Sequence, residues 1–169
     1  EQIENSNYGQ DLPYLLNTLP STVVTSDAGA GVGYTGIRIR GIDPTRTNVT
    51  INGIPVNDSE SHGVYWVNMP DLSSSVENIQ VQRGVGTSTN GASAFGASIN
   101  IKTDHIKREA YGVLDNSYGS FNTMKNTIKA GTGLINNKFT LDTRLSRVSS
   151  GGYIDRAESD LKSYYASGA

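Results

Sequence analysis

Four short segments rich in β-branched residues, each containing a glycine, constrain the fold of this chain most strongly. They are residues 37–41, 50–56, 76–84 and 94–103. β-Branched side chains favour extended backbone, and glycine permits the tight turns that end a strand. Such a pattern predicts a small sheet of short strands joined by turns. The expected strands cover residues 22–25, 36–40, 48–51, 54–56, 76–82 and 98–103.

Helical spacing is confined to short stretches. Residues 11–19 predict a helix whose apolar face is formed by Leu12, Leu15, Leu16 and Leu19. Asp11 is a suitable N-cap, and Pro20 marks the end of this helix. Residues 70–75 predict a further helical turn. Short strands mixed with small helices therefore predict an α+β domain with a short mixed sheet, ending near residue 104.

Composition excludes several classes of protein. The chain has no cysteine, which rules out a disulfide-stabilised scaffold and a thiolate metal site. Its net charge of −2 and the lack of a basic stripe argue against nucleic acid as a partner. No run approaches the ~20 apolar residues of a membrane helix. Strands of a membrane β-barrel remain compatible with this composition, because they alternate and score low in hydropathy.

After a charged linker at residues 105–109, the pattern changes to long alternating strands. Within residues 138–148, one face carries Phe139, Leu141, Thr143 and Leu145, and the other carries Lys138, Thr140, Asp142, Arg144 and Ser146. Residues 125–134 alternate more weakly, and residues 135–137 form a turn between the two strands. Their length matches the ~9–11 residues that cross a bilayer. A water-soluble antiparallel sheet alternates in the same way, so alternation alone leaves both possibilities open.

In order and spacing, the four glycine-containing segments resemble the plug domain of TonB-dependent outer-membrane receptors. The resemblance implies that residues 1–104 form a plug and that residues 105–169 begin a transmembrane β-barrel with three or four of its antiparallel strands. Two later segments, 117–121 and 152–156, are similar to the early barrel of these receptors, particularly in Bacteroidetes. On this interpretation the chain is the front portion of a larger receptor.

The resemblance also implies a function. Such receptors sit in the outer membrane of Gram-negative bacteria and import a scarce nutrient actively, with the plug gating the barrel lumen. An iron-siderophore or similar chelate is the expected ligand, and haem, cobalamin and glycans are bound by other members. The expected partners are outer-membrane lipid and TonB, the latter through a box upstream of Glu1. No cofactor is expected. The alternative is a soluble ligand-binding or adhesion module with no transport role.

Two arginines are the first candidate site residues. Arg40 and Arg83 each precede the glycine of an Arg-Gly turn. In the family, arginines at these positions latch the plug to glutamates of the barrel wall, because a guanidinium binds a carboxylate with two parallel hydrogen bonds. The alternative is that each arginine satisfies local carbonyl groups within the plug.

Three loops are expected to face the ligand, namely residues 26–34, 43–47 and 57–66. Their candidate contact residues are Asp43, Arg46, Asn57, Asp58, Glu60, His62, Tyr65 and Trp66. Aromatic and hydrogen-bonding side chains on a loop suit the capture of a polar chelate. Tyr65 and Trp66 could instead anchor the third loop. Asp58, Glu60 and His62 alternate as metal ligands can, although a solvated loop explains them more simply.

No catalytic constellation is expected. Residues 29–33 lack the glycine spacing of a dinucleotide-binding loop, and no Walker lysine follows a glycine loop. The only histidines are His62 and His105, and neither lies near the serine-rich runs. The sequence therefore predicts a protein that is not an enzyme.

Overall fold

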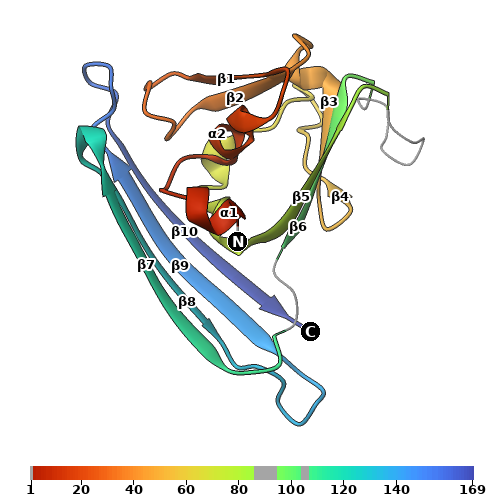
Figure 1. Cartoon of the computed structure of the whole chain (residues 1–169), viewed down its shortest axis with the longest axis vertical. Helices are drawn as coiled ribbons and strands as arrows, with labels where there is room; N and C mark the ends of the chain where they lie inside the picture. Colours follow the sequence, from red (N-terminus) through yellow and green to blue (C-terminus); the bar gives the residue numbers. More distant parts are fainter. Residues whose placement is uncertain (1, 86–94, 104–106) are drawn as a thin grey trace.

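The computed structural model describes residues 2–85, 95–103 and 107–169. In it, a long, curved four-stranded sheet wraps one side of a smaller α+β unit, as Figure 1 shows. We call the first part, residues 2–103, the N-terminal unit and the second part, β7–β10, the C-terminal sheet. The expected boundary at residue 104, and part of the charged linker after it, lie outside the described residues.

The N-terminal unit contains short helices and short strands, as its sequence predicts. Its elements are α1 (Gln2–Ser6), α2 (Leu12–Leu15), η1 (Leu16–Thr18), β1 (Thr22–Ser26), β2 (Thr35–Ile39), η2 (Pro44–Arg46), β3 (Thr47–Ile51), β4 (Ile54–Pro55), η3 (Trp66–Asn68), η4 (Leu72–Ser75), β5 (Val76–Arg83) and β6 (Ala97–Thr103). The α+β class with a short mixed sheet is confirmed.

Strand pairing places β6 in the interior of the larger sheet. The larger sheet has the order β4-β3-β6-β5, and β6 runs parallel to β3 and antiparallel to β5. A separate antiparallel hairpin joins β1 to β2. Because β6 lies between two neighbours, its side chains at Ala97, Ile99 and Ile101 are almost fully buried. The unit is therefore built around the last of the four predicted segments.

Apolar side chains from both sheets and from the helices form one core in this unit. The buried members are Leu12, Leu16, Ile37, Ile39, Val49, Trp66, Val76, Ala97, Ile99 and Ile101. The predicted helix at residues 11–19 is present as α2 followed by the 3₁₀ turn η1. Asp11 occupies the N-cap position, but its side chain makes no capping hydrogen bond. The buried leucines of this helix fix it against the strands.

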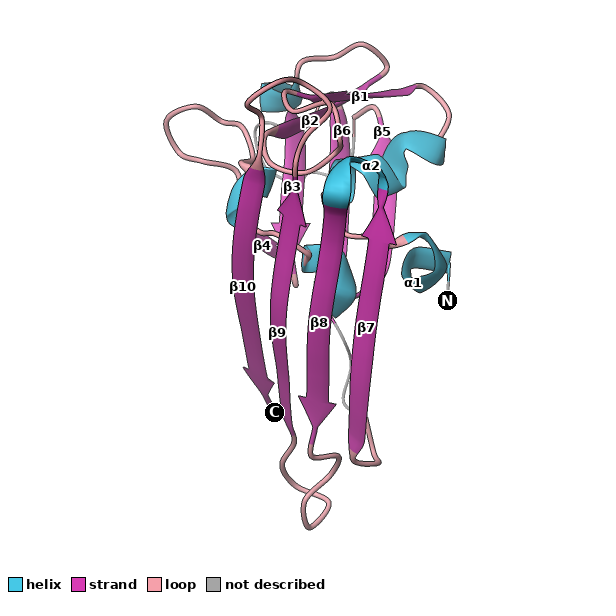
Figure 2. Cartoon of the chain, turned by 90° about the vertical axis from the view of Figure 1, so that its left-hand side faces the viewer, coloured by secondary structure: helices cyan, strands magenta, loops and turns pink. Residues whose placement is uncertain are grey.

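The C-terminal sheet is an antiparallel meander. Its strands are β7 (Tyr111–Gly119), β8 (Thr123–Gly131), β9 (Leu141–Ser150) and β10 (Ser159–Gly168), and the 3₁₀ turn η6 (Ser120–Asn122) joins the first two. Figure 2 shows these strands side by side, in front of the N-terminal unit. The predicted turn at residues 135–137 is confirmed, because Asn136 and Asn137 adopt positive φ values of 52° and 56°.

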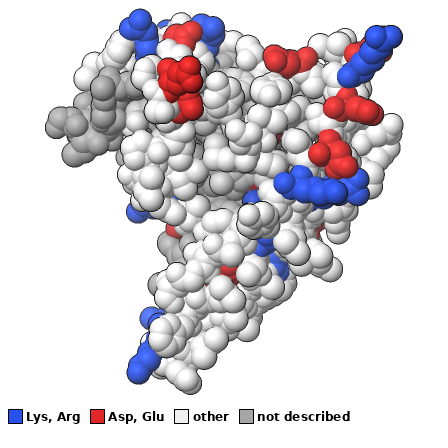
Figure 3. All heavy atoms as spheres, turned by 180° about the vertical axis from the view of Figure 1, so that it is seen from behind, with Lys and Arg blue, Asp and Glu red and all other residues white. Residues whose placement is uncertain are grey.

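Alternation along β8 and β9 separates two faces of this sheet. Lys125, Thr127, Arg144 and Ser146 are buried against the N-terminal unit, whereas Ile128 and Leu145 are exposed on the outer face. The alternation predicted for residues 139–146 is therefore confirmed, with Arg144 and Ser146 on the inner face and Phe139, Leu141 and Leu145 on the outer face. On the side of the molecule shown in Figure 3, charged side chains lie mainly towards the ends and edges, with a largely uncharged surface between them.

Residues 116–119 belong to β7 and pair with residues 123–126 of β8. Backbone pairing with β8 imposes the strand, although serine, asparagine and glycine favour turns. Among the described residues, no helix is long and apolar enough to cross a membrane.

Candidate functional site

A buried carboxylate at the contact between the two units is the most distinctive polar feature of the structure. Asp71 precedes η4 and adopts a left-handed conformation, with φ 52° and ψ 29°. Its carboxylate accepts hydrogen bonds from Ser74 at 2.6 Å, Thr127 at 2.7 Å and Ser146 at 2.5 Å. Thr127 and Ser146 belong to β8 and β9. One side chain of the N-terminal unit is therefore bound directly by two strands of the C-terminal sheet.

Two cations of the C-terminal sheet flank this carboxylate. Lys125 Nζ lies 3.7 Å from one Asp71 oxygen, and Arg144 Nη1 lies 3.7 Å from the other. The side chains of Asp71 and Lys125 are both 0% exposed. Lys125 also donates a 2.7 Å hydrogen bond to Asp115, whose side chain is 45% exposed. Away from water, charges at these separations attract strongly.

The electrostatic balance keeps Asp71 ionised. Burial raises the pKa of the Asp71 carboxyl, but the Lys125 ammonium and the hydrogen bonds from Ser146, Ser74 and Thr127 outweigh burial and leave this pKa below its usual value. A charged acceptor strengthens the hydrogen bonds that it receives. Asp71 is therefore an anionic anchor between the two units.

The chain just after α1 completes the site. Asn7 Nδ2 donates to Asp71 at 3.3 Å and to Ser74 at 2.9 Å, and Lys125 Nζ donates to the Asn7 carbonyl at 3.2 Å. We call this group the Asp71 cluster, and its members are Asn7, Asp71, Ser74, Lys125, Thr127, Arg144 and Ser146. It joins the N-terminal segment, the turn before η4, and strands β8 and β9.

Further contacts between the two units are also largely polar. Ser163 of β10 donates to the Pro70 carbonyl at 2.9 Å, next to the cluster. Tyr165 donates to Thr103 at 3.1 Å, and the Tyr153 amide donates to the Ala28 carbonyl at 2.8 Å. The interface is thus held mainly by hydrogen bonds and ion pairs.

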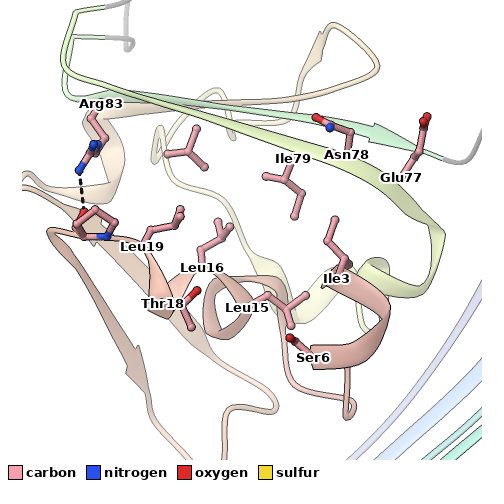
Figure 4. Close-up of a pocket in the computed structure, with 12 residues that line it drawn as sticks. Ile3, Ser6, Leu15, Leu16, Thr18, Leu19, Glu77, Asn78, Ile79 and Arg83 are labelled. Atoms are coloured by element: carbon pink, nitrogen blue, oxygen red, sulfur yellow. Dashed lines mark hydrogen bonds between the residues drawn. The ribbon is translucent and has the colours of Figure 1, made fainter. Parts of the chain in front are cut away.

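The two candidate latch arginines lie close together at the surface. Both are exposed, and Arg40 has a positive φ of 54°. Its guanidinium lies beside Gly84, with Nη1 3.4 Å from the position of a Cβ built there. Arg83 donates to the Pro20 carbonyl at 3.2 Å, as the dashed line in Figure 4 shows. Arg83 therefore binds a local carbonyl group, which was the alternative to the latch. A latch from either arginine to a barrel carboxylate stays a prediction.

Arg83 stands at one end of a groove of about 520 Å³. Figure 4 shows the apolar side chains of α1, α2 and η1 on one side of this groove, facing Ile79 of β5 on the other. Elsewhere in the N-terminal unit, burial raises the pKa of Asp11 to about 6, although hydrogen bonds from Thr35 and Gly33 oppose the rise. The polar lining residues of the groove include Ser6, Thr18 and Glu77.

The candidate loop around Asp43 is organised by local contacts. Asp43 accepts hydrogen bonds from the backbone and the hydroxyl of Thr45, at 3.0 and 2.8 Å. These bonds, with Arg38 and Arg46 nearby, hold the pKa of Asp43 below its usual value. The Arg46 guanidinium lies 5.0 Å from the centre of the Phe95 ring. Both candidates therefore have local partners, and contact with a ligand remains a prediction for them.

In the third loop, polar candidates shape the backbone. Asn57 accepts from the Val49 amide at 2.8 Å and donates to two carbonyls, of Thr47 and His62. Asp58 accepts from the Ser61 amide at 2.7 Å, and hydrogen bonds from Ser61 and Glu60 lower its pKa. No three His, Asp or Glu side chains are arranged to hold a metal ion within the part of the chain that the structure describes.

The two aromatic candidates of this loop differ. Trp66 is only 4% exposed and packs in the core of the N-terminal unit, whereas Tyr65 is 48% exposed. The burial of the Trp66 indole agrees with the alternative that this side chain anchors the loop. Of the loop's aromatic candidates, Tyr65 is the one that is accessible at the surface.

Comparisons with known proteins agree with this architecture. The family model described as TonB-dependent Receptor Plug Domain matches residues 1–98. The vitamin B12 transporter BtuB of Vibrio vulnificus (strain YJ016) is 30% identical over 106 residues, which are 63% of this chain and 17% of that protein. The ferric enterobactin receptor of Pseudomonas aeruginosa is 28% identical over 124 residues, covering 68% of this chain and 17% of the receptor.

A solved structure extends the likeness to both units. The FrpB iron transporter from Neisseria meningitidis superposes with a TM-score of 0.75 at 19% identity, covering 99% of this chain and 27% of that one. Because nearly the whole chain is covered, the C-terminal sheet has the same fold and placement as the corresponding part of that transporter. The chain spans about 17% of the length of the curated relatives that it matches.

Proposed function

Because the chain belongs to the TonB-dependent receptor plug domain family, we propose that the full-length protein is an outer-membrane receptor that imports a scarce nutrient by active transport. Residues 1–104 are its plug, and residues 105–169 begin its transmembrane β-barrel. Segments 117–121 and 152–156 support an origin in Bacteroidetes. The protein acts as a transporter and not as an enzyme.

The outer face of the C-terminal sheet supports its role as barrel wall. Strand pairing places Leu114, Ile128, Leu145 and Tyr164 in one row across the sheet. All four are exposed here, and Tyr164 reaches 85%. A continuous exposed apolar row is costly in water and suits contact with lipid tails.

The observation that carries the proposal is the Asp71 cluster. It fastens the plug to the inner face of the wall through groups that water can solvate once they separate. Ligand binding at the outer loops shifts the plug, and TonB then acts on a box upstream of Glu1. Energy comes from the proton-motive force through this partner. A gate needs an interface of this kind, firm when closed and reversible when opened.

Ligand chemistry follows from the loops and the relatives together. We propose an iron-siderophore or similar chelate, since relatives are named as receptors for ferric enterobactin and other siderophores. Cobalamin, haem and glycans are the other candidates, the first because of a relative named as a vitamin B12 transporter. Exposed Tyr65 and the polar candidates from Asp43 to His62 would form the plug's share of the site. Arg40 and Arg83 would latch the plug to carboxylates elsewhere in the barrel.

Uptake by cells tests this function. The full-length receptor is expressed in Gram-negative cells that lack their own receptors, with and without TonB. Radioiron-labelled enterobactin and radiocobalt-labelled cyanocobalamin are the probes. We expect saturable uptake of one probe that disappears without TonB. Equal uptake in both strains, or no uptake of either probe by correctly inserted receptor, would overturn the proposed transport of these ligands.

A further inference from the structure

We propose that Asn7 couples tension on the N-terminal segment to the opening of the Asp71 cluster, so that residues 7–9 act as a strap over the buried charges. The inference rests on the proposed function, because it concerns how a pull from the N-terminal side reaches the plug. Asn7 has a positioning role in this inference, because it acts through Asp71 and Lys125.

Asn7 bridges the two opposite charges. The 3.7 Å between Lys125 Nζ and Asp71 is too long for a direct hydrogen bond. Asn7 contacts both groups, because its carbonyl accepts from Lys125 at 3.2 Å and its Nδ2 donates to Asp71 at 3.3 Å. The same Nδ2 donates to Ser74 at 2.9 Å. One residue therefore satisfies an anion of the plug and a cation of the wall together.

The next two residues hold the strap against the sheet. The Tyr8 carbonyl accepts a 2.9 Å hydrogen bond from Ser117 of β7. Gly9, with φ of 101°, lies so close to β8 that an added Cβ would stand 3.0 Å from Lys125 Cβ. Asn7 and Gly9 are both buried. The segment thus covers Lys125 on the side from which water would otherwise enter.

Chain order makes the strap the first interface element to feel a pull. Upstream of it, the structure describes only α1. The next anchor downstream is Asp11, whose amide donates to the Gly31 carbonyl at 2.8 Å. Withdrawal of residues 7–9 removes a donor from Asp71 and an acceptor from Lys125. Water then reaches both charges and weakens their attraction, since the Coulomb energy falls as the effective dielectric rises.

Pulling on the receptor tests the inference. The full-length receptor is held in lipid nanodiscs and loaded through its N-terminus in a force spectrometer, without ligand or TonB. Asn7→Ala should release the plug segment at a fixed force about tenfold faster than wild type, because a buried ion loses a hydrogen-bond partner. Asn5→Ala, an exposed position on α1, is the matched control and should leave the rate unchanged.

Two further variants keep the result interpretable. Asn7→Asp preserves size but turns an acceptor towards Asp71, so it should also speed release even if the alanine variant assembles poorly. In a Lys125→Met background, adding Asn7→Ala should change the release rate by a different factor than in wild type, because the Asp71 carboxylate that the Asn7 side chain binds has lost its neighbouring cation. Independent effects of the two changes would contradict bridging by Asn7.

The outcomes separate this inference from the proposed function. TonB-dependent uptake with equal release rates for wild type, Asn7→Ala and Asn7→Asp would overturn the strap and leave the transporter in place. Faster release in both Asn7 variants, without TonB-dependent uptake in cells, would uphold the coupling and remove the proposed transport role.

Discussion

Replacing Lys125 by methionine should loosen the contact between the plug and the barrel wall. Methionine fills a similar volume but carries no charge. The change removes the ammonium next to Asp71 while both side chains are fully buried in wild type. Breaking one partner of a buried ion pair typically costs ~3–5 kcal/mol. Asp71 keeps three hydroxyl donors and Arg144 at 3.7 Å, so we expect the lower end, about 3 kcal/mol.

Hydrogen exchange of the full-length receptor measures this loss. A decrease of about 3 kcal/mol corresponds to about 100-fold faster exchange of amides that become accessible when the interface opens. The amides of residues 71–75 should show it. Lys162→Met, at an exposed position on β10, is the control and should leave these amides unaffected. The same protection of residues 71–75 in wild type and Lys125→Met would refute the argument that the buried pair holds the interface.

Three further changes test other parts of the fold. Burial raises the pKa of Asp11 to about 6, so the neutral carboxyl is favoured in the folded plug. Its contribution to plug stability, about 3 kcal/mol, is present below a pH of about 4 and is lost as the pH rises through about 6. Asp11→Asn should abolish this pH dependence, measured as amide exchange of the plug at different pH values. Gly96→Ala should lower the free energy of unfolding by about 1–3 kcal/mol, measured with denaturant, because its Cβ would stand 2.6 Å from the Arg46 carbonyl oxygen. A Cβ at Gly112 would meet nothing within 4 Å, so Gly112→Ala should have only a small effect. Ile99→Ala should lower the free energy of unfolding by about 2–5 kcal/mol in the same experiment, because it leaves a cavity in the core. A smaller loss than that of Gly112→Ala would contradict the central place of β6.

The strands of the N-terminal unit could be predicted because their signals are local. Residues 76–82 and 98–103 carry β-branched side chains bounded by turn residues, and they form β5 and β6. Pairing order is a different matter. The parallel contact between β3 and β6 joins residues about half the length of the unit apart, and nothing in either segment specifies its partner. The burial of Ala97, Ile99 and Ile101 on one face of β6 therefore depends on contacts that the local sequence does not specify.

The C-terminal sheet shows where alternation stops being informative. β8 and β9 were expected because apolar and polar residues alternate along them. β7 and β10 carry serine, asparagine, glycine and charged residues on both faces, so their sequences resemble loops. They are strands because a paired neighbour supplies the hydrogen bonds of their backbone. Tertiary context, and not propensity, defines these two strands.

The Asp71 cluster could not be predicted from the sequence, because it also depends on tertiary contacts. Arg144 and Ser146 were placed on the polar face of their strand, so two of the seven members of the cluster could be anticipated. Asp71 follows a proline in a serine-rich turn and looks like any solvated aspartate. Lys125 is 54 residues away and stood at the start of a predicted strand. Only the docking of the two units shows that these charges are buried and opposed.

The contrast between this interface and the core of the plug indicates which of the two separates first under load. Inside the plug, Ile39, Ile99 and Trp66 bury apolar surface, and exposing such surface to water is costly at every step. Across the interface, Asp71 and Lys125 exchange protein partners for water when they separate, and a well-packed apolar contact of the same size would often be more stable. Under a rising load, the interface should open before the apolar core unfolds, because opening the interface requires less free energy. We therefore expect the plug to detach from β8 and β9 while its own core is still folded, so that amide exchange of residues 71–75 rises before that of β6. The reverse order would mean that the plug unfolds in place and that the cluster remains closed under load.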